Sequence, residues 1–147
     1  MSNKPILFTA RTDGSAVPAG VPGESGYLNA VSNPPVGASN AYINLVTKVF
    51  DPGIWAIQGM VYMNRGTATG LDLVVGAISL TSQAIDPSPS WVGTSYLPAG
   101  DFSVNTPTRF LNISTPTTVY LVARTGYTTA GNAAWGTASI MTWQRIG

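Results

Sequence analysis

The chain has 147 residues, of which only 9% are charged, with seven Lys or Arg, six Asp or Glu, a net charge of +1, and neither His nor Cys. Without His or Cys there is no imidazole base, no catalytic thiol and no ordinary zinc site, so we expect no enzyme activity, no metal and no cofactor. We also expect no nucleic-acid partner, because phosphate binding needs a basic stripe that these scattered cations do not form.

The N-terminal part is dominated by Gly, Pro, Ser and Asn, above all between residues 17 and 39. Such a composition forbids a helix and most central strands. We therefore predict an extended N-terminal arm over 1–40, followed by one domain over 41–147. The apolar head of the arm is a candidate anchor on another protein, through Ile6, Leu7, Phe8 and Arg11. An equally weighted alternative is a first strand and a loop within one subunit.

No apolar run near the N-terminus is long enough for a secretory signal or a bilayer span. We therefore expect a chain that is made in the cytoplasm and has no membrane partner.

From residue 41 onward the chain is rich in Val, Ile, Thr, Tyr and Trp and is broken by Gly or Pro at short intervals. This pattern is typical of an all-β domain. With a strand from the arm, the segments favour an antiparallel two-sheet jelly-roll sandwich of about eight strands. The strands are predicted at 41–50, 54–64, 71–81, 90–96, 108–113, 117–125 and 134–145.

Several of these strands are apolar on both faces, as at 54–62, where Trp55 and Ile57 lie on one face and Ile54 and Ala56 on the other. A two-layer sandwich covers only one face of each sheet, so the second face indicates burial against other subunits, and we predict a trimer. Arg109 and Arg124 adjoin apolar strands and are candidates for salt bridges between subunits. The predicted interface residues are Trp55, Tyr62, Tyr120, Val122, Arg124 and Trp143.

Five short hydrophobic motifs resemble those of tailed-phage structural proteins with a tumour-necrosis-factor-like jelly roll. The resemblance covers about residues 41 to 146 and implies a homotrimer. The motifs are Asp51-Pro52-Gly53-Ile54-Trp55-Ala56-Ile57-Gln58-Gly59, Ala77-Ile78-Ser79-Leu80-Thr81, Arg109-Phe110-Leu111-Asn112-Ile113, Thr117-Thr118-Val119-Tyr120-Leu121-Val122-Ala123 and Ala134-Trp135-Gly136-Thr137-Ala138-Ser139-Ile140.

The resemblance implies one of two roles in a bacteriophage virion. The first is a capsid cement or decoration protein, a homotrimer on the capsid surface that bridges neighbouring major capsid proteins and stabilises the shell. The sequence outside the domain favours this role, because the arm has no heptads or collagen-like period from which a fibre shaft could be built.

The alternative role is a receptor-binding tip of a head or tail fibre that recognises a host surface glycan. Candidate aromatic side chains for stacking on a sugar are Trp91, Tyr96, Tyr127 and Trp135, although large aromatics more often fill a core or a subunit seam. A glycosidase is the remaining hypothesis, and it would need two of Asp72, Asp86 and Asp101 in one cleft.

Overall fold

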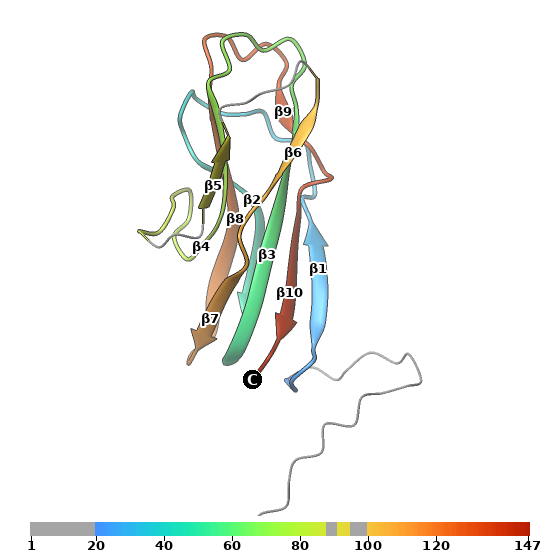
Figure 1. Cartoon of the computed structure of the whole chain (residues 1–147), viewed down its shortest axis with the longest axis vertical. Helices are drawn as coiled ribbons and strands as arrows, with labels where there is room; N and C mark the ends of the chain where they lie inside the picture. Colours follow the sequence, from blue (N-terminus) through green and yellow to red (C-terminus); the bar gives the residue numbers. More distant parts are fainter. Residues whose placement is uncertain (1–19, 88–90, 95–99) are drawn as a thin grey trace, which may run out of the picture.

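The structure is a computed structural model that describes residues 20–87, 91–94 and 100–147, with the backbone alone for 91–94. Within these residues there is no helix, and two antiparallel sheets form the domain (Figure 1). The predicted all-β fold with two antiparallel sheets is therefore confirmed. The strands are β1 (Ser25–Asn29), β2 (Ile43–Phe50), β3 (Gly53–Asn64), β4 (Leu73–Ser79), β5 (Trp91–Thr94), β6 (Phe102–Asn105), β7 (Arg109–Ile113), β8 (Thr117–Gly126), β9 (Ala134–Trp135) and β10 (Ile140–Arg145).

The six-stranded sheet is built around β3, which is its longest strand. One side of β3 pairs with β10 and, further along, with β9, and β1 pairs with the outer side of β10. The other side of β3 pairs with β7 and then β6. The four-stranded sheet has the order β2-β8-β4-β5. Strand β1 lies within the predicted arm and occupies a sheet edge, where a Gly-rich segment is tolerated.

The pairing along each side of β3 is interrupted, between β6 and β7 on one side and between β9 and β10 on the other. At each break a side-chain hydroxyl replaces the missing backbone partner. Between β6 and β7 the Gly59 N–H donates to Thr106 Oγ1 at 2.8 Å. Between β9 and β10 the Tyr62 N–H donates to Ser139 Oγ at 2.9 Å. Since buried backbone groups need partners, these hydroxyls let β3 remain continuous while its neighbours bend.

The core lies between the two sheets and follows the alternation of each strand. On β8, for example, Val119 and Leu121 are fully buried and belong to the core, whereas Tyr120 between them faces outward. The largest fully buried side chains are Trp135, Phe50, Ile57, Met63, Ile78, Leu121 and Met141.

The central residues on the outer face of the four-stranded sheet are buried within the chain itself. Val75, Ala77 and Val122 lie outside the core cluster, yet their exposed fractions are only 1%, 1% and 0%. Residues 80–87 cross this face: Asn44 on β2, beyond β8, donates to Ser82 Oγ at 2.8 Å and accepts from the Gln83 N–H at 2.8 Å. The second apolar face predicted for β4 and β8 therefore needs no other subunit to bury its central residues.

Candidate functional site

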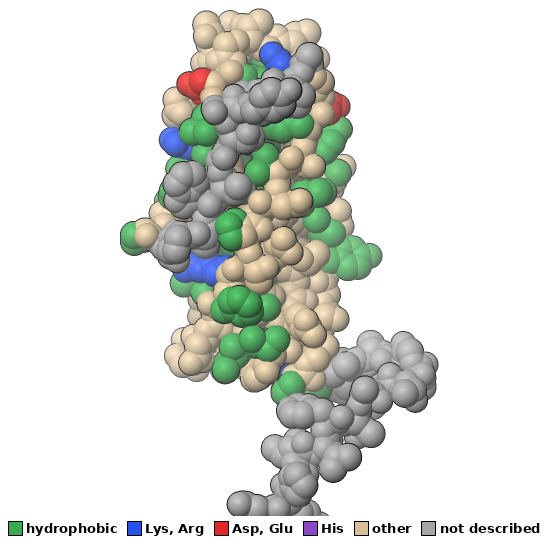
Figure 2. Space-filling view, viewed as in Figure 1, with side chains coloured by type: hydrophobic (Ala, Val, Ile, Leu, Met, Phe, Trp, Pro, Cys, Tyr) green, Lys and Arg blue, Asp and Glu red, His purple; other side chains and the backbone are tan. Residues whose placement is uncertain are grey.

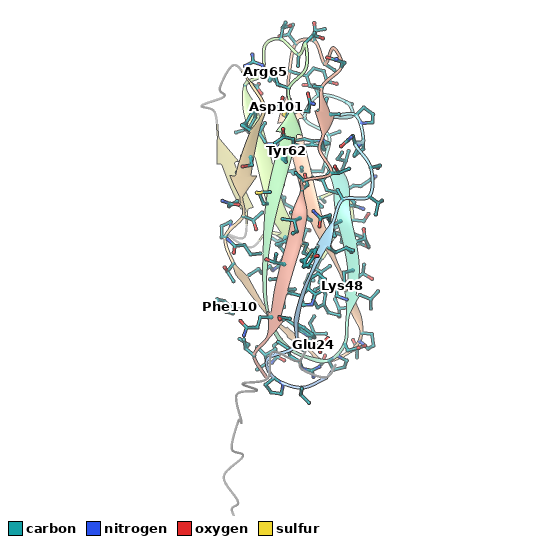
Figure 3. The ribbon with its side chains drawn as sticks, turned by 90° about the vertical axis from the view of Figure 1, so that its right-hand side faces the viewer. Glu24, Lys48, Tyr62, Arg65, Asp101 and Phe110 are labelled. Atoms are coloured by element: carbon teal, nitrogen blue, oxygen red, sulfur yellow. The ribbon has the colours of Figure 1, made fainter. Side chains whose placement is uncertain are left out.

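The outer face of the six-stranded sheet is the main apolar surface that the described chain leaves uncovered. We call it the open face. Four of its hydrophobic side chains are markedly exposed: Tyr27 at 69%, Phe110 at 67%, Ile146 at 48% and Ile54 at 41%. The pairing register places Phe110 beside Ala56, and Ile146 follows β10 next to Ile54. In Figure 3, Phe110 projects away from the body of the domain.

No outward position of the described strands β1, β3, β6, β7 and β10 carries a charge. The polar positions hold amides and hydroxyls instead, as at Gln58, Thr142 and Gln144. Figure 2 shows green patches within a tan surface, with the few blue and red side chains near its margins. Because charged residues are depleted from the centres of protein interfaces, this composition is typical of a surface that becomes buried.

Two hollows lie on the open face. The lower one has a volume of about 320 Å³ and is lined by Ser25, Ala56, Gln58, Thr108, Thr142, Trp143 and Gln144. The second, which we call the upper hollow, has about 350 Å³ and is lined by Asn33, Tyr62, Asn64, Asn132, Ala134, Gly136, Thr137 and Ala138.

At the rim of the upper hollow, Tyr62 donates its hydroxyl proton to Asp101 Oδ2 at 3.0 Å (Figure 3). Asp101 Oδ1 accepts from the Arg65 N–H at 3.0 Å, so its carboxylate is held at the end of β3 by two donors. The hydrogen bond to Asp101, then burial, and then the negative charge of Asp101 raise the pKa of Tyr62 above its ordinary value. Tyr62 therefore stays a neutral hydrogen-bond donor well into the alkaline range.

A second cluster surrounds Asp86 on the segment that crosses the four-stranded sheet. Its carboxylate accepts hydrogen bonds from Ser79 Oγ, the Leu80 N–H and Thr81 Oγ1, and it forms an ion pair with Arg109. Burial alone would raise the pKa of Asp86. The hydrogen bonds from Leu80, Arg109 and Thr81, with the charge of Arg109, outweigh burial and lower the pKa below the usual value.

The candidate interface residues do not share one surface. Trp55 is 2% exposed and points into the sandwich, where its indole donates to Asp51 O at 3.0 Å. Trp143 is also turned inward and packs against the core. Tyr62 alone lies on the open face. Tyr120, Val122 and Arg124 are on the outer face of the four-stranded sheet. Whether any of them contacts another subunit stays a prediction.

The two arginines predicted to bridge subunits have partners within the chain. Arg109 pairs with Asp86 and also donates to Ile78 O at 2.9 Å. Arg124 lies over the ring of Tyr42, 5.1 Å from its centroid.

Of the candidate ligand-facing aromatics, Trp135 is fully buried in the core, so its prediction as an exposed sugar-stacking residue is wrong. Tyr127 is held by contacts within the chain. Its hydroxyl donates to Gly37 O, its backbone N–H donates to Ser39 Oγ, and its ring packs against the core. The side chain of Trp91 and the whole of Tyr96 lie outside the described residues, as do the candidate anchors Ile6, Leu7, Phe8 and Arg11.

Phe110 and Tyr27 were not among the candidate residues, although a signal for Phe110 was present. In Arg109–Ile113 the apolar Leu111 and Ile113 occupy alternate positions, which places Phe110 on the opposite face. Tyr27 gave no such signal, because it stands in a Gly- and Ser-rich segment with little strand propensity.

Two of the three carboxylates named for a glycosidase have partners within the chain. Asp86 and Asp101 are both engaged in the bonds given above. Among the described residues, no group of three or more Asp or Glu is placed to hold a metal ion. None of the described segments is a helix of the length and apolarity needed to cross a membrane.

No known family model matches the chain, and a search of curated proteins likewise finds no match. The resemblance to phage proteins therefore stays a prediction.

Proposed function

We propose that this protein is a homotrimeric virion component that decorates the capsid surface, and that its subunits pack through the part of the open face nearer the C-terminus, which leaves the upper hollow free. The observation that carries the proposal is the open face itself, where Tyr27, Ile54, Phe110 and Ile146 are exposed on strands without outward charges. Burial of one such side chain contributes about 2 kcal/mol, so a few of them per subunit suffice to drive association.

The strand order supports a jelly roll. When β6 with β7 and β9 with β10 are each counted as one interrupted strand, the six-stranded sheet has the order first-eighth-third-sixth. The other sheet has the order second-seventh-fourth-fifth. This order is the one expected when two Greek keys are wrapped into a sandwich, and it therefore supports the proposal of a jelly roll.

The position of the chain ends supports attachment through the arm. Residue 20, where the described chain begins, lies at the same end as the C-terminus (Figure 1). The Gly23 N–H donates to Arg145 O at 2.8 Å, and Glu24 forms an ion pair with Arg145 at 3.8 Å. In a trimer, three arms would leave from the same end and could bind neighbouring major capsid proteins together. Linked binding of this kind raises avidity without stronger individual contacts.

The experiment compares full-length protein with a variant that lacks residues 2–16 for binding to purified shells that lack the protein. The proposal predicts that the full-length protein saturates the shells and raises their melting temperature, and that the truncated protein stays a trimer but binds far more weakly. Equal occupancy of the shells by both proteins would overturn the anchoring role of the arm.

A second candidate function is recognition of a host surface glycan by a trimeric fibre tip. The observation that favours it is the upper hollow, which is polar, uncharged and rich in side-chain amides.

A further inference from the structure

We propose that the upper hollow is a binding site for a neutral oligosaccharide. The hollow lies where the end of β3, the strand β9 and the connection from β1 to β2 meet. It is at the end of the domain away from the C-terminus (Figure 1). If the protein is attached to a particle through the end from which the arm leaves, the end with the upper hollow would face outward. The inference rests on the hollow and does not depend on the capsid role.

Three asparagines that line the hollow each accept a backbone hydrogen bond through the side-chain oxygen. The side-chain oxygen of Asn33 accepts from the Thr137 N–H at 2.8 Å, that of Asn64 from the Gly66 N–H at 3.1 Å, and that of Asn132 from the Thr67 N–H at 2.7 Å. Because each oxygen is held by the backbone, the NH₂ groups remain as hydrogen-bond donors without a partner among the described residues. The lining of the hollow therefore contains three asparagines whose oxygens are fixed by the backbone and whose NH₂ groups are available to a ligand.

Glycines let the walls of the hollow approach one another closely. Gly66 has φ +51°, and a Cβ at this position would lie 2.2 Å from Asn132 Oδ1. A Cβ on Gly136 would lie 2.2 Å from the Tyr62 ring. Side chains held in this way lose little freedom when a ligand binds, which favours affinity.

The charges around the hollow favour a neutral ligand. None of the lining residues is charged, and the nearby carboxylate of Asp101, bonded to Tyr62, would repel an anion. Ala134, Ala138 and the Tyr62 ring supply apolar surface beside the amide donors. Oligosaccharides combine C–H faces with hydroxyl and carbonyl oxygens, so their chemistry fits this lining.

A peptide fits the hollow less well, because the backbone donors around it are already used. The N–H groups of Trp135, Gly136 and Thr137 donate to Pro34 O, Tyr62 O and Asn33 Oδ1 respectively. A peptide strand therefore finds no free edge here to pair with.

The test is a titration of the full-length ¹⁵N-labelled protein, followed by the NMR signals of the side-chain amides of Asn33, Asn64 and Asn132. The neutral probes are trisaccharides of glucose, galactose, mannose and N-acetylglucosamine, each to about 20 mM, which detects even weak binding. The comparison probes are sialyllactose and a capped triglycine. We expect at least one neutral trisaccharide to shift these amide signals saturably.

A matched pair of variants tests the location. Ala138 lines the hollow and Ala38 lies outside its lining, and both are exposed, so replacement by Tyr should leave the fold intact. Ala138→Tyr should weaken binding at least tenfold by filling the hollow, whereas Ala38→Tyr should not.

The proposal is overturned if no neutral probe shifts the three signals, if only sialyllactose or the peptide does, or if Ala138→Tyr binds as well as Ala38→Tyr. Sedimentation of the same samples reports the oligomeric state separately. A failure of sugar binding is therefore distinguishable from a failure of trimer formation.

Discussion

Asp86 and Arg109 form an ion pair that joins the two sheets at one side of the sandwich. Asp86 follows β4 of the four-stranded sheet, and Arg109 begins β7 of the six-stranded sheet. Both side chains are largely buried, with 11% and 12% of their surfaces exposed. The pair therefore ties the segment 80–87, which follows β4, to the other sheet.

Replacing the carboxylate in Asp86→Asn should lower the free energy of unfolding by about 2 kcal/mol, because Arg109 would be left largely buried without its counter-charge. Asp51→Asn is the matched control: Asp51 is exposed, and its replacement should change stability by less than about 0.5 kcal/mol. Urea unfolding of the three proteins measures the difference. Equal midpoints for the wild type and Asp86→Asn would contradict the role of the pair.

The same pair predicts a pH dependence with a definite sign. The pKa of Asp86 is lowered in the folded protein, so its contribution to stability is present above the ordinary carboxyl value of about 4 and is lost as the pH falls through that region. The stability difference between wild type and Asp86→Asn should therefore be constant near neutrality and shrink on acidification. Unfolding curves between pH 7 and pH 3 measure it, and a difference that grows in acid would be inconsistent with this account.

The Tyr62–Asp101 hydrogen bond predicts how the pKa of Tyr62 responds to a change at Asp101. Because this bond is the main cause of the raised pKa of Tyr62, Asp101→Asn should bring the pKa back toward the ordinary value of about 10. The ring carbon signal of Tyr62, assigned by comparison with Tyr62→Phe, can be followed by NMR from pH 8 to pH 12. An unchanged titration in Asp101→Asn would show that the bond does not form in solution.

Close packing of the two sheets at Gly59 gives a prediction for the core. A Cβ on Gly59 would lie 2.4 Å from Leu121 Cδ1, which is fully buried on the opposite sheet. Gly59→Ala should therefore cost about 1 to 3 kcal/mol through overpacking. Gly100→Ala is the control, since nothing lies within 4 Å of a Cβ there. Thermal unfolding compares the two variants, and similar melting temperatures would argue against this packing.

Long strands with strong alternation could be predicted from the sequence. The predicted strand at 54–64 corresponds closely to β3 (Gly53–Asn64), and that at 117–125 to β8 (Thr117–Gly126). The predicted strand at 134–145 is in fact divided into β9 and β10. The Ser139 hydroxyl that bonds to Tyr62 at this break makes a long-range contact that no local pattern reveals.

The candidate site was predictable only in part. Burial of the outer sheet faces against other subunits was inferred from strands that are apolar on both faces, but the sequence alone did not reveal that residues 80–87 lie across the outer face of the four-stranded sheet. The position of this segment depends on the bonds of Asn44 to Ser82 and Gln83, which join positions far apart in the chain. The amide orientations in the upper hollow likewise depend on loop contacts, such as that between Asn132 and Thr67.

Subunit packing through the open face predicts the effect of a charge placed there. Phe110→Lys should dissociate the trimer by burying an unpaired ammonium, while the isolated subunit keeps its fold. Val49→Lys is the matched control, since Val49 is 55% exposed on the outer face of the other sheet. Size-exclusion chromatography with light scattering compares their masses. A trimer that survives Phe110→Lys would place the interface elsewhere.

The most direct measurement is the mass of the unaltered protein by sedimentation equilibrium at micromolar concentration. The account predicts a single species with the mass of three 15.3 kDa chains. A folded monomer under these conditions would contradict it, because the exposed aromatic and aliphatic side chains of the open face would then have no partner to bury them.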